Sequence, residues 1–355
     1  MNPIQFAKNI IKNLLARIKA HQFNAGLKKG VYDGKLIILM YHRVLPKHDP
    51  RLATEEPGMY VTPETLNMHL SELSKIAQLI HIEEWLELAK ANALENKLYC
   101  AITFDDGWAD NYEFAFPLLK KHKAPACIFL ATDYIGTDTT FWPERLAAAL
   151  IDYTKNSTTK LKLDAFFSEL GEEIDTTKLN RQNRDYISYL IQIAKQKPDD
   201  EIKSFLDTLS KRKASSKDKA KYQTEMLSWE QVKEMQEAGV QFGGHTRSHL
   251  RLNNQVRPDR LKNEIIGCAD DIKQNIGTPP ALFCYPNGDT SKNALELVES
   301  RYLAAVTTQT GINQPKNTQA HLLKRIGVHE DESYQKRTFH SKLSCLHIAS
   351  SKERV

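Results

Sequence analysis

Apolar and polar residues follow two different periods along this chain. Seven short apolar runs, rich in β-branched residues, predict strands buried on both faces, and they lie at 36–41, 99–104, 126–131, 240–242, 282–285, 304–308 and 323–328. Between most of these runs, apolar residues recur every three or four positions. This spacing predicts helices at 63–75, 111–121, 229–238, 259–275 and 292–301.

Strands that alternate with helices predict a parallel sheet. The fold class is therefore α/β, and we expect a (β/α) barrel, distorted or incomplete, with about seven parallel strands. From Phe141 to about Met226 the pattern changes to a charged, largely helical region that ends in a lysine-rich stretch. We interpret 143–226 as a helical insertion, which either covers the open end of the barrel or only decorates it. The chain thus divides into an N-terminal helix at 1–30, a barrel domain at 31–335 with its insertion, and a C-terminal tail at 336–355.

Composition excludes several classes of protein. The 355 residues are 41% hydrophobic, enough for a large core. The net charge is +5, but the basic residues are spread over many segments, so we expect no nucleic-acid partner. The five cysteines contain no Cys-x-x-Cys pair, which favours reduced thiols in the cytosol. The sequence contains no glycine-rich phosphate loop, so we expect no nucleotide cofactor.

The first segment is basic and amphipathic. Lysine and arginine residues interrupt each of its apolar runs, so we expect no secretory signal and a cytoplasmic protein. Apolar residues nevertheless recur at helical spacing, at Ile4, Ala7, Ile11, Leu14, Leu15 and Ile18. Such a helix either packs on its own domain or lies peripherally on the anionic inner face of the membrane.

Two segments carry candidate metal chemistry. Thr103-Phe104-Asp105-Asp106-Gly107 follows a predicted strand, and His245-Thr246-Arg247-Ser248-His249 follows another. Each motif alone is often a turn or a pair of surface histidines, but both lie where active-site groups of a barrel gather. Adjacent side chains point in different directions, so Asp106 can bind a cation with His245 and His249 while Asp105 accepts a proton. A carboxylate with two imidazoles suits a catalytic divalent ion, most favourably Zn²⁺.

These segments resemble the first two signatures of polysaccharide deacetylases of the nodulation-protein-like type, carbohydrate esterase family four. Those signatures are Thr-Phe-Asp-Asp-Gly and His-Ser/Thr-x-x-His, and the resemblance runs from about Leu36 to about Val328. The segments at 39–44 and 283–288 resemble a branch found among surface-polysaccharide biosynthesis proteins. The resemblance implies that 31–335 is the catalytic domain, that Asp105 is the general base, and that the metal ligands are Asp106, His245 and His249.

The third signature of the family, Arg-x-x-Tyr-Gly, is altered here. The matching segment is Cys284-Tyr285-Pro286-Asn287-Gly288, so the arginine that orients the base is replaced by Cys284. The resemblance implies that another cation, Arg43 or Arg325, takes that role. Asn287 stands in place of the tyrosine whose backbone N–H stabilises the oxyanion, and its own N–H is our candidate for that role.

The last family signature, Leu-x-His, supplies the general acid. Its counterpart places His329 just after a predicted strand, with Gly327 in place of the leucine. His329 is our candidate for this acid and His42 is the competitor. For contacts with the substrate we expect His42, Tyr285 and Trp142. Trp142 and its neighbour Phe141 either stack on a sugar ring or serve the core or a hinge.

The resemblance implies a hydrolase that removes N-acetyl groups from amino sugars. The expected partner is a glycan of a cell-surface polysaccharide or its lipid-linked precursor. Two alternatives remain open: a degenerate carbohydrate-binding protein, because the third signature lacks its arginine, and a metal-dependent amidase on a non-sugar substrate. A glycosidase needs two carboxylates on opposite sides of the scissile bond, which Asp105 and Asp106 do not supply.

Overall fold

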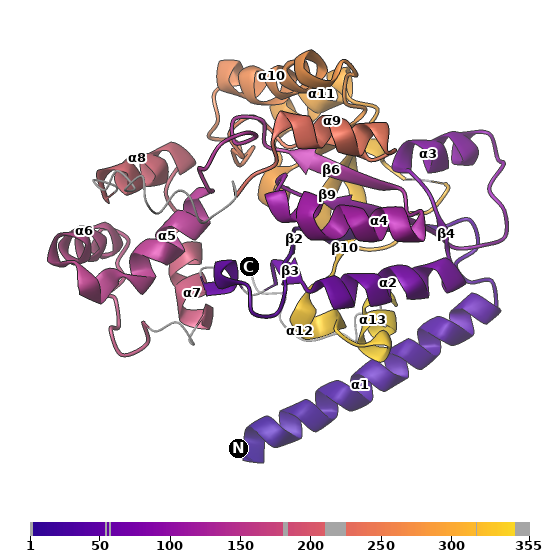
Figure 1. Cartoon of the computed structure of the whole chain (residues 1–355), viewed down its shortest axis with the longest axis horizontal. Coiled ribbons are helices and arrows are strands. Elements are labelled where there is room, and N and C mark those ends of the chain that lie inside the picture. The colour runs from indigo at the N-terminus through magenta and orange to yellow at the C-terminus, as the bar shows by residue number, and fades with distance from the viewer. Residues whose placement is uncertain are drawn as a thin grey trace.

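The computed structural model describes residues 3–344 except 54, 57, 180–183, 210–224 and 317. A closed ring of parallel strands forms its centre (Figure 1). The ring consists of β1 (Leu36–Tyr41), β5 (Tyr99–Phe104), β6 (Ala126–Leu130), β7 (Gln241–Gly244), β8 (Leu282–Cys284), β9 (Ala304–Thr310) and β10 (Leu323–Gly327). Each strand pairs with the next in the order β1-β10-β9-β8-β7-β6-β5, and β1 pairs with β5 to close the ring. The predicted (β/α) barrel of about seven parallel strands is confirmed.

Helices surround the ring close to the predicted positions. They are α2 (Pro63–Ile76), α4 (Phe116–His122), α9 (Trp229–Glu237), α10 (Pro258–Ile276) and α11 (Lys292–Arg301). Thr62 caps α2 by accepting a hydrogen bond from the Thr65 N–H, and Ser228 forms a capping box at the start of α9. The helix predicted at 111–121 begins instead as a π-helical turn, Asn111–Ala115.

Shorter elements lie outside the closed ring of strands. Strand β4 (Gln78–Leu79) pairs with β5 and is followed by α3 (Ile82–Lys90), while β2 (Arg43–Val44) and β3 (Tyr60–Val61) pair with each other. The sequence pattern did not predict these elements because most of them are too short to show a period.

The strand side chains separate into two apolar layers with a period of two. Leu36 and Ile38 join one cluster together with side chains from β5, β6, β8, β9 and β10. Ile37 and Leu39 join another cluster, which contains side chains of α2, α4 and α9. The first layer is therefore the barrel interior, and the second lies between the barrel and its helices. Because both faces are buried, the strands are apolar along their whole length.

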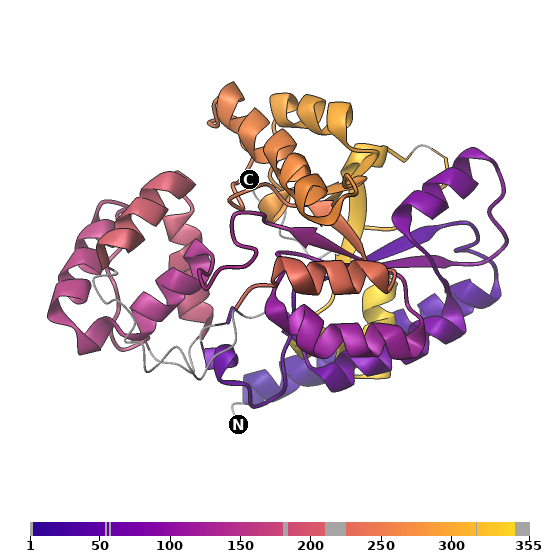
Figure 2. The ribbon, with the colours of Figure 1, turned by 45° about the horizontal axis from the view of Figure 1, so that its top comes forward.

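The insertion forms a separate helical lobe (Figure 2). Its helices are α5 (Trp142–Ile151), α6 (Ser157–Ser168), α7 (Arg184–Ala194) and α8 (Asp199–Leu209). They enclose their own apolar core, which includes Trp142, Leu146 and Phe167. The predicted lysine-rich stretch at 211–221 lies outside the described residues.

The two ends of the described chain pack together. Helix α13 (Lys336–Leu343), which follows the short α12 (Glu330–Ser333), lies in the segment that the sequence pattern assigned to a tail. It contacts the C-terminal part of α1 (Pro3–Lys28), where the Phe23 and His340 rings lie 5.9 Å apart. Among the described helices, none is long and apolar enough to span a membrane.

His69 connects α2 to the C-terminal helices in a neutral form. Its Nδ1 accepts a hydrogen bond from the Tyr41 hydroxyl at 3.0 Å, and its Nε2–H donates to the Ser333 carbonyl at 2.8 Å. Its ring also stacks on Phe339, with centroids 3.9 Å apart. Burial lowers the pKa of His69 to about 4, because a charged imidazole loses its hydration there.

We predict that acid destabilises the fold through His69. Between pH 6.5 and 4 the unfolded chain binds a proton that the folded chain excludes, so stability falls as the pH falls through this window. The loss attributable to His69 approaches about 3 kcal/mol at pH 4. Denaturant unfolding of wild type and His69→Gln at several pH values measures the contribution of His69. The other histidines titrate in both proteins, so their contributions cancel in the difference. The stability advantage of wild type should shrink on acidification; a constant difference would refute the prediction. His21→Gln, on the exposed surface of α1, is the matched control.

Candidate active site

Three predicted metal ligands meet at the carboxyl ends of β5 and β7. Asp106 Oδ1 lies 3.4 Å from the Nε2 atoms of both His245 and His249. Ligand atoms about 2.0–2.1 Å from a tetrahedral zinc ion lie about 3.3 Å apart. The separations therefore fit an ion between these atoms, and one carboxylate with two imidazoles is a donor set typical of zinc.

Neighbouring groups orient these ligands. The Nδ1–H of His245 donates to the Cys284 carbonyl at 2.7 Å, which leaves the Nε2 lone pair directed at Asp106. Trp108 Nε1–H donates to Asp106 Oδ2 at 2.9 Å and leaves Oδ1 for the histidines. Burial alone would raise the pKa of Asp106, but hydrogen bonds with His245 and His249 hold it well below its usual range.

The backbone around the site adopts conformations that L-residues rarely use. Among the described residues, six non-glycine residues have positive φ, and four of them lie in the site loops: Asp106 (80°), Thr246 (61°), His249 (54°) and Asn287 (58°). Gly107 follows with φ of 85°, and a Cβ there would lie 2.8 Å from Ile135. Backbone strain of this kind concentrates at functional sites, which agrees with a catalytic or binding role for these loops.

Asp105 forms a two-point ion pair with Arg325 inside the barrel. Arg325 Nη1 lies 2.7 Å from Oδ1 of Asp105, and Nη2 lies 2.7 Å from Oδ2. Of the two arginines considered from the sequence, Arg325 thus contacts Asp105. Arg43 instead bonds to Asp110 and stacks on Trp108, 4.0 Å from the ring centroid.

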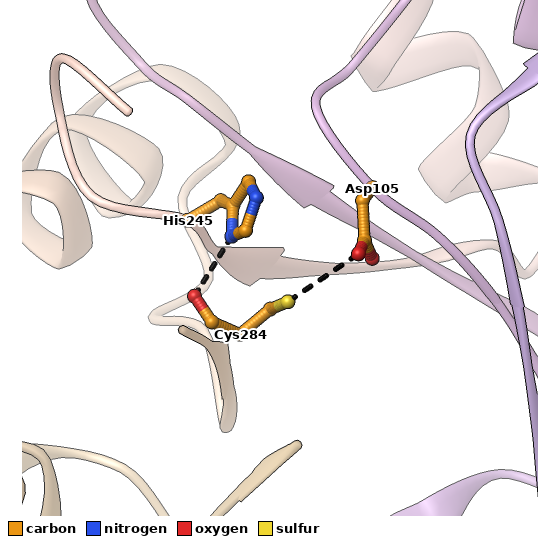
Figure 3. A group of neighbouring side chains, drawn as sticks. All are labelled: Asp105, His245 and Cys284. Carbon is orange, nitrogen blue, oxygen red and sulfur yellow. Dashed lines mark hydrogen bonds between the residues drawn. The ribbon is translucent and has the colours of Figure 1, made fainter. Parts of the chain in front are cut away.

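Cys284 occupies the space beside this ion pair. Its Sγ lies 3.6 Å from Asp105 Oδ2 and 3.1 Å from Arg325 Nη2. Figure 3 shows Cys284 between Asp105 and His245, which both contact it. The small side chain leaves room for the guanidinium of Arg325. Burial would raise the pKa of Asp105, but Arg325, followed by His42 and His245, holds it below its usual value.

The two candidate general acids lie in different surroundings. His42 follows β1, and its Nε2 is 3.7 Å from Asp105 Oδ2. His329 follows β10, where its Nδ1 pairs with Asp331 and its Nε2 lies 3.2 Å from Glu332. The structure therefore brings His42 close to Asp105 and engages His329 with neighbouring carboxylates.

The other predicted contact residues also differ in placement. Asn287 is exposed after β8, and its side chain accepts a hydrogen bond from Lys195 Nζ at 2.9 Å. Tyr285 is fully buried against Phe283 in the cluster beneath α10 and α11, a placement that fits packing rather than substrate contact. Trp142 is buried in the core of the insertion.

Of the two adjacent aromatic residues considered from the sequence, Phe141 lies with its ring 4.7 Å from the His249 ring. Sequence reasoning missed two other residues at the site. Trp108 binds Asp106; its position two residues after that carboxylate was the available signal. Lys195 comes from the distant insertion, and no local pattern links it to the site.

The insertion contacts the loops that carry site residues. Lys203 Nζ donates to the Ser248 carbonyl at 2.9 Å, next to His249. Arg251 Nε donates to Asp199 at 2.8 Å at the start of α8. These contacts connect the insertion to the histidine loop and help to hold that loop in place.

The fold and the site together define a (β/α) barrel with a candidate metal centre beside a buried, ion-paired carboxylate. A comparison with protein families matches polysaccharide deacetylase over residues 94–162 and 188–306, more than half of the chain. The chain belongs to the polysaccharide deacetylase family, which confirms the resemblance. It is 32% identical over 102 residues to the Bacillus subtilis protein YxkH, which is named as a polysaccharide deacetylase. That stretch spans 29% of this chain and 34% of YxkH.

Solved structures show the same fold. The Streptococcus pyogenes deacetylase PplD, in complex with acetate, has a TM-score of 0.54 and 20% identity, covering 84% of this chain and 95% of PplD. IcaB from Ammonifex degensii has a TM-score of 0.53 and 20% identity, covering 87% of this chain and 97% of IcaB. At these identities the similarity concerns the fold.

We predict that the three clustered ligands bind a divalent ion. After stripping and reloading with Zn²⁺, the wild type should hold about one ion per chain. Asp106→Ala or His245→Ala should lower the affinity by roughly two orders of magnitude or more, because the donor set loses a member. Equilibrium dialysis with elemental analysis measures this. Asp105→Asn is the matched control and should retain the ion; tight binding by Asp106→Ala would refute the assignment.

Proposed function

We propose that this chain is a metal-dependent deacetylase that removes N-acetyl groups from amino sugars of a cell-surface polysaccharide or its lipid-linked precursor. The observation that carries the proposal is the buried Asp105, paired with Arg325 and adjacent to the cluster of Asp106, His245 and His249. This arrangement places a proton acceptor next to a candidate metal centre. The donor set favours Zn²⁺.

Different residues serve different steps of the proposed hydrolysis. When bound, the ion would supply positive charge that polarises the acetyl carbonyl and a water molecule. Asp105, kept ionised by Arg325, accepts the proton of the attacking water. The backbone N–H of Asn287 stabilises the negative charge that develops on the carbonyl oxygen.

A histidine then protonates the leaving amine, and acetate and a free amino sugar are released. His42 is the stronger candidate because its Nε2 lies 3.7 Å from Asp105. His329 remains the alternative suggested by the resemblance, and its Nε2 lies 3.2 Å from Glu332. Comparing turnover of His42→Gln and His329→Gln separates the two candidates.

The binding-only alternative depended on the missing arginine of the third signature. Arg325 supplies a guanidinium to Asp105 from another strand, which weakens that alternative. An amidase acting on a non-sugar substrate would use the same site, so the choice of substrate must be tested directly.

A cytoplasmic location belongs to this proposal. Among the described residues, Cys100, Cys127, Cys268 and Cys284 are free and buried. Buried free thiols are consistent with a reducing compartment.

We predict metal-dependent acetate release from N-acetylated amino-sugar oligomers. Asp105→Asn should lower kcat by about 10²–10⁴-fold while the ion stays bound, because the amide cannot accept the proton. An acetate assay on a panel of sugar and non-sugar acetamides measures this. Release from the non-sugar amides alone would contradict the proposed substrate class, and wild-type rates in Asp105→Asn would contradict its role as the base.

We also predict that Arg325 positions the base. Arg325→Lys keeps a positive charge but cannot hold both oxygens of Asp105 in parallel. We expect kcat to fall by between about 10- and 100-fold with little change in KM or bound metal. Cys284→Ser is the matched control at the same ion pair and should stay near wild type. An unchanged kcat in Arg325→Lys would show that orientation of Asp105 does not limit the reaction.

A further inference from the structure

The N-terminal half of α1 leaves a row of apolar side chains uncovered. Ile10, Ile11, Leu14 and Ile18 are 53%, 57%, 56% and 43% exposed. Figure 1 shows this half of the helix extending away from the barrel. Large apolar side chains that are exposed singly are common, but four of them along one face of a helix form a patch.

This patch is not the face that packs on the protein. Ala20 and Phe23 are buried, and the Phe23 ring lies 5.1 Å from that of Tyr32. At about 100° per residue, Phe23 is turned about 140° from Ile18 around the helix axis. The helix therefore has one face for its own domain and a second apolar face that is about half exposed.

The charge of the segment indicates what covers the second face. Lysine or arginine occurs at 8, 12, 17 and 19, and no Asp or Glu precedes Asp33. Arg17 is exposed beside the apolar patch, about 20° from Ile10 around the helix axis, whereas Lys12 is exposed on the same side of the helix as Phe23. If the same helix of a second copy covered the patch, basic residues of both copies would meet with no acid to neutralise them. An anionic surface would neutralise these basic residues instead.

We propose that α1 lies on an anionic lipid surface, with its apolar patch in the boundary between headgroups and acyl chains. Arg17 then contacts lipid phosphates, as basic residues do in other amphipathic helices that bind membrane surfaces, and the remaining basic residues add to the attraction. This surface is separate from the catalytic site, so it does not depend on the proposed deacetylase activity. It would bring the enzyme to substrates carried at a membrane.

Vesicle sedimentation of the full chain tests the proposal. Vesicles of phosphatidylcholine with phosphatidylglycerol should bind the wild type, and phosphatidylcholine alone should not. Binding should weaken when the ionic strength rises to about 0.5 M, because salt screens the basic residues. The double variant Leu14→Glu, Ile18→Glu should lose at least about 10-fold in affinity, since its carboxylates face the lipid. Leu161→Glu is the matched control, because Leu161 on α6 is 70% exposed and distant in sequence.

Two further measurements make the outcome decisive. Acetate release from a soluble oligomer should be unchanged in the double variant, which separates this proposal from the catalytic one. Light scattering over a range of protein concentrations tests whether a second copy of the chain covers the patch by forming a dimer. Equal binding to neutral vesicles, unchanged binding by the double variant, or a dimer that the double variant abolishes would overturn the proposal.

Discussion

The ion pair between Arg325 and Asp105 links two strands of the barrel at the level of the candidate site. A buried ion pair loses hydration, so it is tolerated only when its hydrogen-bonding capacity is filled. All five N–H groups of Arg325 have partners: the Thr307 carbonyl, the Thr103 hydroxyl, both oxygens of Asp105 and the sulfur of Cys284. Asp105, the candidate base, is thereby fixed in orientation before any substrate arrives.

A second chain of contacts supports the candidate metal ligand Asp106. Its Oδ2 accepts from Trp108, whose ring stacks on Arg43. Arg43 in turn bonds to Asp110 and Glu55, both buried, and to Glu225 at 3.1 Å. Glu225 lies at the C-terminal end of the insertion defined from the sequence, 143–226. The insertion is thus connected to the site from two sides, here and through the histidine loop, which suggests that it contributes to the shape of the site.

The strands could be predicted from the sequence because both of their faces are buried. β1 and β5 begin and end at the predicted residues, since a fully apolar run flanked by polar residues has clear limits. Asp105 and Asp106 were found in the same way, as polar residues at the end of such a run. Trp142 illustrates the limit of this reasoning. Its neighbour Phe141 lies against His249, and local sequence does not reveal which of two adjacent aromatic rings faces the core.

The sequence by itself determined the alternation of strands and helices, the candidate metal ligands and the apolar face of the first helix, because these depend on local period and residue type. Only the tertiary structure decided that Arg325 contacts Asp105, that His42 lies nearer to Asp105 than its sequence separation suggests, and that α1 packs with a face other than its apolar patch. Each of these depends on strands or helices far apart in the chain becoming neighbours when the barrel closes through the pairing of β1 with β5.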